Sequence, residues 1–248
     1  MRLLILGVGD AFTASNFHSG ALLHAPEGPV LIDCGHLPFR ALAEAAHAAS
    51  DPTTHQDIHN VLLTHLHADH AGGLEPLGFR RYAERLRGAG LPRPTIHTHD
   101  HAADRLWEML APAMDAPLTP GAARATLDDF FKLRRLDHDK TNTVAGLSVE
   151  LRFTEHPVPT TALRISDGRR TLAWSSDTRF DPDLVDWLAP ADLIVHECNR
   201  PPIHTAPDEL AALPKNLRDK MRLIHLPDDH DPDALPIPPL RAGELLQV

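Results

Sequence analysis

One short segment constrains this chain more than any other. Residues 65–70 hold three histidines and one aspartate in the pattern H-x-H-x-D-H, and Gly72 and Gly73 follow them. The apolar run at 58–64 predicts a buried strand that ends directly at these histidines. A loop after a strand can turn several side chains onto one point, and imidazole and carboxylate groups suit zinc, iron or manganese. A histidine-rich surface turn is the alternative, but this spacing favours a metal site.

The rest of the chain alternates between short apolar strands and amphipathic helices. We expect strands at 2–8, 20–24, 30–34, 58–64, 94–97, 144–154, 161–165, 171–175, 193–195 and 223–226. We expect helices at 37–50, near 69, and at 80–90, 102–110, 127–131, 184–188 and 207–222. This mixture favours a layered α/β architecture over a helical bundle or an all-β barrel. No shift in composition marks a linker, so residues 1–248 are expected to form a single domain.

Composition excludes several classes of protein. The formal net charge of −10 argues against broad electrostatic binding of nucleic acid. No apolar run approaches the roughly 20 residues needed to cross a bilayer, so no membrane partner is expected. The apolar start at 1–7 is too short for a signal peptide and predicts a buried strand instead. Cys34 and Cys198 are too few for a disulfide framework and favour buried free thiols. We therefore expect a cytoplasmic location.

A second histidine-rich run, H-T-H-D-H at 97–101, superficially repeats the first. It lacks the residue between the second histidine and the aspartate, and no glycine pair follows it. Asp100 is therefore expected to be the N-cap of a helix that begins near His101. We expect these histidines to pack in the fold, with a second metal site as the alternative.

The segment T-H-L-H-A-D-H at 64–70 resembles the signature of the metallo-β-lactamase superfamily. Further landmarks stand in the family's order: G-V-G-D-A at 7–11, L-I-D-C-G at 31–35, His156 before Pro157, S-S-D-T at 175–178, and His225 at the end of the last strand. The resemblance covers nearly the whole chain. It implies the α/β metallo-β-lactamase fold, a four-layer αβ/βα sandwich with two mixed β-sheets and the site at one edge.

The resemblance also implies a dinuclear metal site. The first metal would take His65, His67 and His156, the second would take Asp69, His70 and His225, and Asp177 would bridge the two together with a water or hydroxide. Two cations that share a carboxylate lower the pKa of a bridging water, which gives hydroxide near neutral pH. We expect two divalent ions, zinc first, with manganese or iron as alternatives.

Two further residues refine this site. Flavo-di-iron relatives carry a glutamate at the position of His67, so the resemblance excludes an oxygen-reducing role. Asp33 is expected to hold a ligand histidine from behind through a hydrogen bond. A strand-end aspartate that faces water is the alternative for Asp33.

The run V-H-E-C-N at 195–199, followed by His204-Thr205, resembles the ribonuclease Z-like branch of the superfamily. By that analogy His204 would approach the scissile phosphate, and Glu197 would position it or relay its proton. Asp69, Glu197 and His204 are therefore the expected catalytic residues. The metals would supply the nucleophile and neutralise charge, while His204 would protonate the leaving oxygen. The alternatives are a satisfied polar pair at a strand end for His196 and Glu197, and a surface residue for His204.

The expected substrate is a small-molecule or short-oligonucleotide phosphodiester. Members that process tRNA carry a long Gly/Pro-rich arm, and no such insertion is present here. The basic stretch at 215–222 favours a solvated helix face, so tRNA is not an expected substrate. A homodimer is left open. The alternatives are hydrolysis of a lactone or thioester, and a metal- or nucleic-acid-binding module without turnover, which a complete ligand set argues against.

Overall fold

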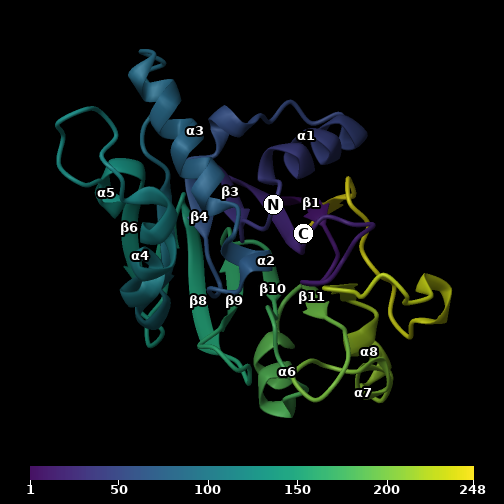
Figure 1. Cartoon of the computed structure of the whole chain (residues 1–248). Coiled ribbons are helices and arrows are strands. Elements are labelled where there is room, and N and C mark those ends of the chain that lie inside the picture. Colours follow the sequence, from purple (N-terminus) through teal and green to yellow (C-terminus); the bar gives the residue numbers. More distant parts are fainter.

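The computed structural model describes residues 1–248, and its strands form two β-sheets of seven and six strands (Figure 1). The first sheet has the order β13 (Leu245–Gln247), β1 (Arg2–Gly7), β2 (Gly20–Ala25), β3 (Gly28–Ile32), β4 (Asn60–Leu62), β5 (Thr95–His99), β6 (Lys132–Leu136). The second has the order β12 (Met221–Ile224), β11 (Leu193–Glu197), β10 (Thr171–Trp174), β9 (Thr161–Ser166), β8 (Leu147–Phe153), β7 (Asn142–Val144). Both sheets are mixed, because β3 to β6 and β10 to β12 pair in parallel and the other neighbours pair antiparallel.

The apolar residues of β1 show how the layers are built. Side chains alternate between the two faces of a strand. Leu3 and Ile5 accordingly pack into a core shared with the second sheet, whereas Leu4 and Leu6 pack into the core under the helices. A third apolar cluster, which includes Leu184, lies on the outer face of the second sheet. Three apolar layers therefore separate four structural layers, and the predicted αβ/βα sandwich is confirmed.

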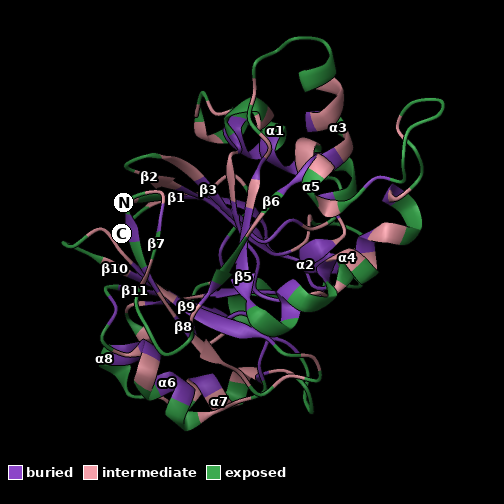
Figure 2. Ribbon diagram, turned by 90° about the vertical axis from the view of Figure 1, so that its left-hand side faces the viewer, coloured by how far each residue is buried: buried purple, intermediate pink, exposed green.

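Helices cover the outer faces of both sheets (Figures 1 and 2). On the first sheet these are α1 (Pro38–Ala49), α3 (Leu74–Leu86), α4 (Asp100–Met114) and α5 (Leu127–Phe130). On the second they are α6 (Pro182–Leu188), α7 (Pro207–Ala211) and α8 (Lys215–Arg218). The remaining helices are α2 (Ala68–Ala71), in the histidine loop, and the 3-10 turns η1 (His55–Asp57) and η2 (Pro232–Ala234). None of the helices has both the length and the apolar character needed to span a bilayer.

Some elements differ from the sequence prediction. The expected strand at 144–154 is a hairpin, because Ala145 and Gly146 adopt positive φ angles of 50° and 80° and turn the chain between β7 and β8. Helix α4 begins one residue early, so Asp100 is not its N-cap. His99 keeps extended backbone there, and its ring accepts a hydrogen bond from the backbone N–H of Ala102 at 3.3 Å. Strands β6 and β13 were not predicted.

Candidate metal centre

Histidine and aspartate side chains gather at one edge of the sandwich, where several strands end. His65 comes shortly after β4, Asp177 after β10 and His225 directly after β12. Strands β4, β10 and β12 each have a parallel neighbour, and parallel strands place their carboxyl ends together. Each sheet therefore delivers ligands to the same place from its own strand ends.

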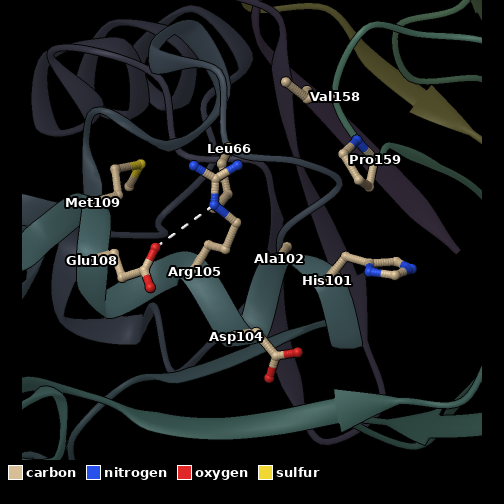
Figure 3. A pocket seen from close by; sticks show the side chains of 9 residues that line it. All are labelled: Leu66, His101, Ala102, Asp104, Arg105, Glu108, Met109, Val158 and Pro159. Carbon is tan, nitrogen blue, oxygen red and sulfur yellow. Dashed lines mark ion pairs between the residues drawn. The ribbon is translucent and has the colours of Figure 1, made fainter.

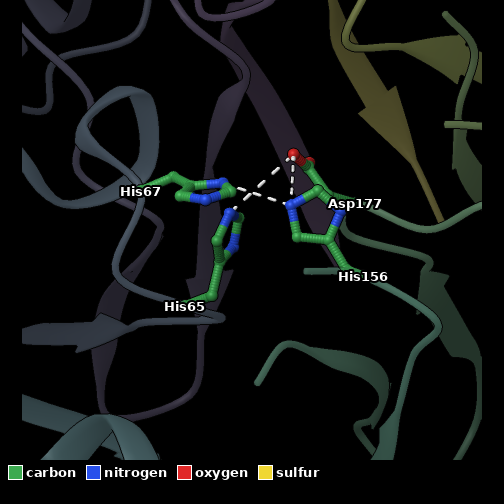
Figure 4. Close-up of side chains that lie close together, drawn as sticks. All are labelled: His65, His67, His156 and Asp177. Atoms are coloured by element: carbon green, nitrogen blue, oxygen red, sulfur yellow. Dashed lines mark hydrogen bonds and ion pairs between the residues drawn. The ribbon is translucent and has the colours of Figure 1, made fainter. Parts of the chain in front are cut away.

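The first cluster contains His65, His67, His156 and Asp177 (Figure 4). The Nε2 atom of His156 lies 3.1 Å from Nδ1 of His67. The Asp177 carboxylate lies 3.8 Å from Nε2 of His65 and 3.7 Å from Nε2 of His156. One donor atom from each of the four residues lies within 4.8 Å of the others, which fits a single bound metal ion.

The second cluster contains Asp69, His70, Asp177 and His225, all of them buried. The Nε2 atom of His70 lies 3.2 Å from carboxylate oxygens of both Asp69 and Asp177. The Nε2 atom of His225 lies 3.2 Å from Asp69 and 3.4 Å from Asp177. Asp177 thus belongs to both clusters, as the bridging role would require.

A buried nitrogen without a partner supports a metal-binding role. The Nε2 atom of His65 is buried and accepts or donates no hydrogen bond within the protein. Such an atom costs free energy unless a ligand uses it. Two donor sets made of imidazole and carboxylate groups fit divalent ions of the first transition row. The residues present therefore fit two divalent ions.

The backbone is strained at three points around the centre. Asp33, Ser176 and His225 have φ angles of 59°, 53° and 61°, in the left-handed region that side chains disfavour. Each such residue costs on the order of 1–3 kcal/mol. The surrounding contacts hold these residues in place, which fixes the direction of the side chains beside them.

Asp33 fixes the orientation of the His70 ring through its Nδ1 atom. Its Oδ2 atom lies 2.8 Å from Nδ1 of His70, and its Oδ1 atom accepts from the backbone N–H of Thr64 at 2.8 Å. Donation from Nδ1 leaves the Nε2 atom of His70 directed at the second cluster. This is the geometry that the sequence predicted for Asp33.

The two clusters differ in the protonation of their histidines. In the first, burial lowers the pKa of His65 well below its ordinary value and that of His156 to about 4. In the second, burial acts the same way, but the carboxylates of Asp177 and Asp33 outweigh it and raise the pKa of His70 well above its ordinary value. The Asp177 carboxylate and a hydrogen bond donated to Asp69 likewise outweigh burial and raise the pKa of His225.

Glu197 and His204 lie next to both clusters. The Glu197 Oε1 atom accepts from the backbone N–H of Thr178 at 2.6 Å and lies 3.0 Å from Nδ1 of His204. The His204 ring centre is 5.5 Å from that of His156 and 5.0 Å from that of His225. His204 therefore stands between the clusters, held by Glu197. Burial and the nearby Asp177 raise the pKa of Glu197 well above its ordinary value.

His196 has a different role from its neighbour Glu197. Its ring is buried, and its Nδ1 atom lies 2.7 Å from the backbone carbonyl oxygen of Glu197. Burial lowers its pKa to about 4. It belongs to neither cluster, so only Glu197 of this pair reaches the centre.

Sequence reasoning missed a polar link behind His225. The buried Nδ2 atom of Asn199 donates to the backbone carbonyl oxygen of His225 at 3.1 Å and to a carboxylate oxygen of Asp10 at 3.1 Å. Asp10 lies in the early segment that carried the family resemblance. Asn199 follows the His-Glu motif by two residues, and only this proximity could have suggested it.

The second histidine-rich run stays outside the centre, as predicted. The Nε2 atom of His97 lies 3.0 Å from the side-chain oxygen of Asn60. The ring of His99 packs against Phe153 with centres 5.2 Å apart. Neither residue belongs to a group of donor atoms close enough to hold a metal ion.

A cavity of about 680 Å³ adjoins the loops of the first cluster (Figure 3). Leu66 lies between two of the cluster's histidines, and Val158 and Pro159 follow the third. The opposite wall is the start of α4. The lining residues are Leu66, His101, Ala102, Asp104, Arg105, Glu108, Met109, Val158 and Pro159.

Comparison with known proteins places this centre in a family. The family model described as Anti-Pycsar protein Apyc1 matches residues 1–241. The chain belongs to the Anti-Pycsar protein Apyc1 family. The Apyc1 protein of Paenibacillus sp. (strain J14) is 32% identical over 238 residues, which cover 92% of this chain and 90% of that relative.

Two solved structures show that this Apyc1 family member has the predicted fold. The metallo-β-lactamase fold protein YhfI from Bacillus subtilis superposes with a TM-score of 0.82 at 21% identity, over 99% of this chain and 98% of that one. The short form of human tRNase Z superposes with a TM-score of 0.70 at 18% identity, over 100% and 99% of the two chains. The predicted metallo-β-lactamase fold is confirmed.

Proposed function

We propose that this chain is a dinuclear metal-dependent phosphodiesterase that acts on a small phosphodiester. The observation that carries this proposal is the position of His204, which Glu197 holds between two clusters that share Asp177. Hydrolysis of a phosphodiester needs a nucleophile, neutralisation of charge and a proton for the leaving oxygen. The centre contains residues for each of these three tasks.

The seven metal-binding residues would hold two divalent ions, with zinc proposed first and manganese or iron as alternatives. Bound ions would supply a hydroxide near neutral pH and neutralise the charge on the phosphoryl group. Asp69 would serve the second ion, and this is its proposed catalytic contribution.

Glu197 and His204 would handle the proton. Because Oε1 of Glu197 lies 3.0 Å from Nδ1 of His204, the hydrogen bond between them fixes the orientation of the ring. Nε2 of His204 would then give its proton to the departing oxygen. Burial lowers the pKa of His204, so its proton is released readily once the oxygen carries developing charge.

Two features support a small substrate. The net charge of −10 disfavours broad binding of nucleic acid, and the chain has no long Gly/Pro-rich insertion. We propose cyclic nucleotides as the first substrates to test, and we expect tRNA precursors to be poor substrates. We also propose that residues 1–248 form a single domain, because the two sheets share one apolar core. The cytoplasmic location and the homodimer stay predictions.

The decisive variant is His204→Ala. It should keep its metal and lose roughly 10²–10⁴-fold in rate on a phosphodiester with an alkoxide leaving group. The loss should shrink for a nitrophenolate, which departs without protonation, and Glu197→Gln should show a milder version of the same pattern. His47→Ala, on the exposed face of α1, is the matched control. Unchanged rates would remove the acid role, and lost metal would make His204 a ligand instead.

A substrate panel tests the reaction class. With zinc or manganese added, cleavage of bis-phosphodiesters should exceed hydrolysis of lactones, thioesters and β-lactams by the same preparation. The reason is that hydroxide attack on a lactone does not require an acid such as His204. A wide preference for a lactone or thioester would assign the chain to that class, and efficient, salt-sensitive cleavage of tRNA precursors would overturn the small-substrate proposal.

A further inference from the structure

Two histidines outside the proposed mechanism lie beside the second cluster. His18 precedes β2, and His36 lies in the turn between β3 and α1. Their ring centres are 5.1 Å apart. A Cβ atom placed on Gly35 would lie 2.7 Å from Cβ of His18 and 2.4 Å from the backbone oxygen of Asp69. Only a glycine fits between His18 and the turn that carries Asp69, so His18 lies directly against the edge of the second cluster.

The hydrogen bonding of His18 fixes which nitrogen carries its proton. The backbone N–H of His36 donates to Nδ1 of His18 at 3.2 Å. An imidazole nitrogen that accepts a hydrogen bond has no proton, so the neutral ring carries its proton on Nε2. His18 therefore presents one N–H donor, and no group of the protein accepts from it.

The surroundings of the His18 ring indicate which kind of ligand its free N–H suits. Gly35 separates His18 from the backbone oxygen of Asp69, and Asp69 belongs to the second cluster. His18 is half-buried, so its side chain is partly open to a ligand. A neutral donor beside a cluster that binds cations suits an oxygen that already carries negative charge.

We propose that His18 is a substrate-binding residue whose Nε2–H donates a hydrogen bond to a non-bridging phosphoryl oxygen of the phosphodiester. This inference rests on the proposed function and extends it, because it names a contact that is independent of the metal ligands and of His204. The contact would orient the phosphoryl group toward the nucleophile and would be kept by a phosphate product.

A purely structural role makes the opposite prediction for two variants. The side-chain oxygen of asparagine occupies the place of Nδ1, so His18→Asn keeps the acceptor for the His36 turn and lacks the outer donor. The amide nitrogen of glutamine reaches the place of Nε2, so His18→Gln keeps a donor there and lacks the acceptor. The two substitutions therefore separate substrate binding from support of the turn.

The first readout is binding of inorganic phosphate to the metal-loaded protein, followed by ³¹P NMR or calorimetry. We expect His18→Asn to weaken phosphate binding roughly ten- to a hundred-fold, the range for a lost hydrogen bond to a charged group, and His18→Gln to stay within about three-fold of the parent. Metal content should not change in either variant. His47→Asn, on the exposed face of α1, is the matched control.

Kinetics give the second readout. On an active phosphodiester, kcat/KM should follow the same order, with the parent close to His18→Gln and well above His18→Asn. Equal phosphate affinity in all three proteins would overturn the inference, and so would full activity in His18→Asn with unfolding at lower temperature in His18→Gln. If no phosphodiester is cleaved, the proposed function fails, while the phosphate measurement still decides the role of His18.

Discussion

The two clusters that share Asp177 contain the same residue types but are held together in different ways. In the first, burial lowers the pKa of His65 well below its ordinary value and that of His156 to about 4. In the second, His70 and His225 lie within 3.4 Å of carboxylates and have raised pKa values. The imidazoles of the first cluster can therefore bind a metal ion without losing a proton. Those of the second cluster must first lose the proton that their raised pKa values favour.

This difference follows from where the carboxylates lie. Asp33 and Asp69 lie 2.8 Å and 3.2 Å from ring nitrogens of His70, and burial strengthens their attraction for a proton on that ring. In the first cluster, the Asp177 carboxylate lies 3.8 Å from Nε2 of His65 and 3.7 Å from Nε2 of His156. Two ions of the same metal would therefore compete with protons to different extents at the two clusters.

The largest expected effect comes from the residue that the clusters share. Asp177→Ala should lose most of both metals and nearly all activity, since one carboxylate serves both sites. Elemental analysis of the purified variant measures this, with Asp186→Ala, on the exposed face of α6, as the control. Loss of one metal alone would show that the clusters are independent, and full retention would disprove the bridging assignment.

The next largest effect is expected from acidification, which should weaken metal binding at the two clusters to different extents. Below the raised pKa values of His70 and His225, both imidazoles hold protons that a metal must displace. Affinity at the second cluster should therefore fall by up to about two decades per pH unit as the pH drops from 8 to 6. The first cluster should change little, because the pKa of His156 is about 4 and that of His65 is also lowered.

Metal titrations at several pH values, followed by calorimetry, measure the two slopes. One ion should remain bound at pH 6 while the other dissociates. Parallel loss of both ions would contradict the assignment of the charged imidazoles to the second cluster.

The smallest of the three effects tests the support behind His70. Asp33→Asn removes a charged partner 2.8 Å from Nδ1 of His70 and should weaken the second metal about 10–100-fold, with little change at the first. Asp51→Asn is a matched control. A carboxylate oxygen of Asp51 lies 2.9 Å from Nε2 of His24, and Asp51 belongs to neither cluster. Equal weakening at both sites would show that Asp33 supports the whole loop rather than one ligand.

The sequence predicted the residues that meet at the centre because the relevant signals are local. Spacing identified the loop at 65–70, and each further ligand follows an apolar strand that is recognisable by itself. It did not predict β6, because K-L-R-R-L is a mostly charged edge strand that parallel pairing with β5 defines. Nor could it predict the charges of His70 and His225, which depend on carboxylates up to 156 residues away in the chain.

Residues from both sheets make up each proposed metal site, and this affects the stability of the folded protein. Each cluster takes two of its four residues from loops of the first sheet, His65 and His67 or Asp69 and His70, and two from loops of the second. A bound ion therefore acts as a crosslink across the seam of the sandwich. Ions that bind only the folded protein would stabilise it by RT ln(1 + [M]/Kd), so chelation should lower the free energy of unfolding as well as stop catalysis.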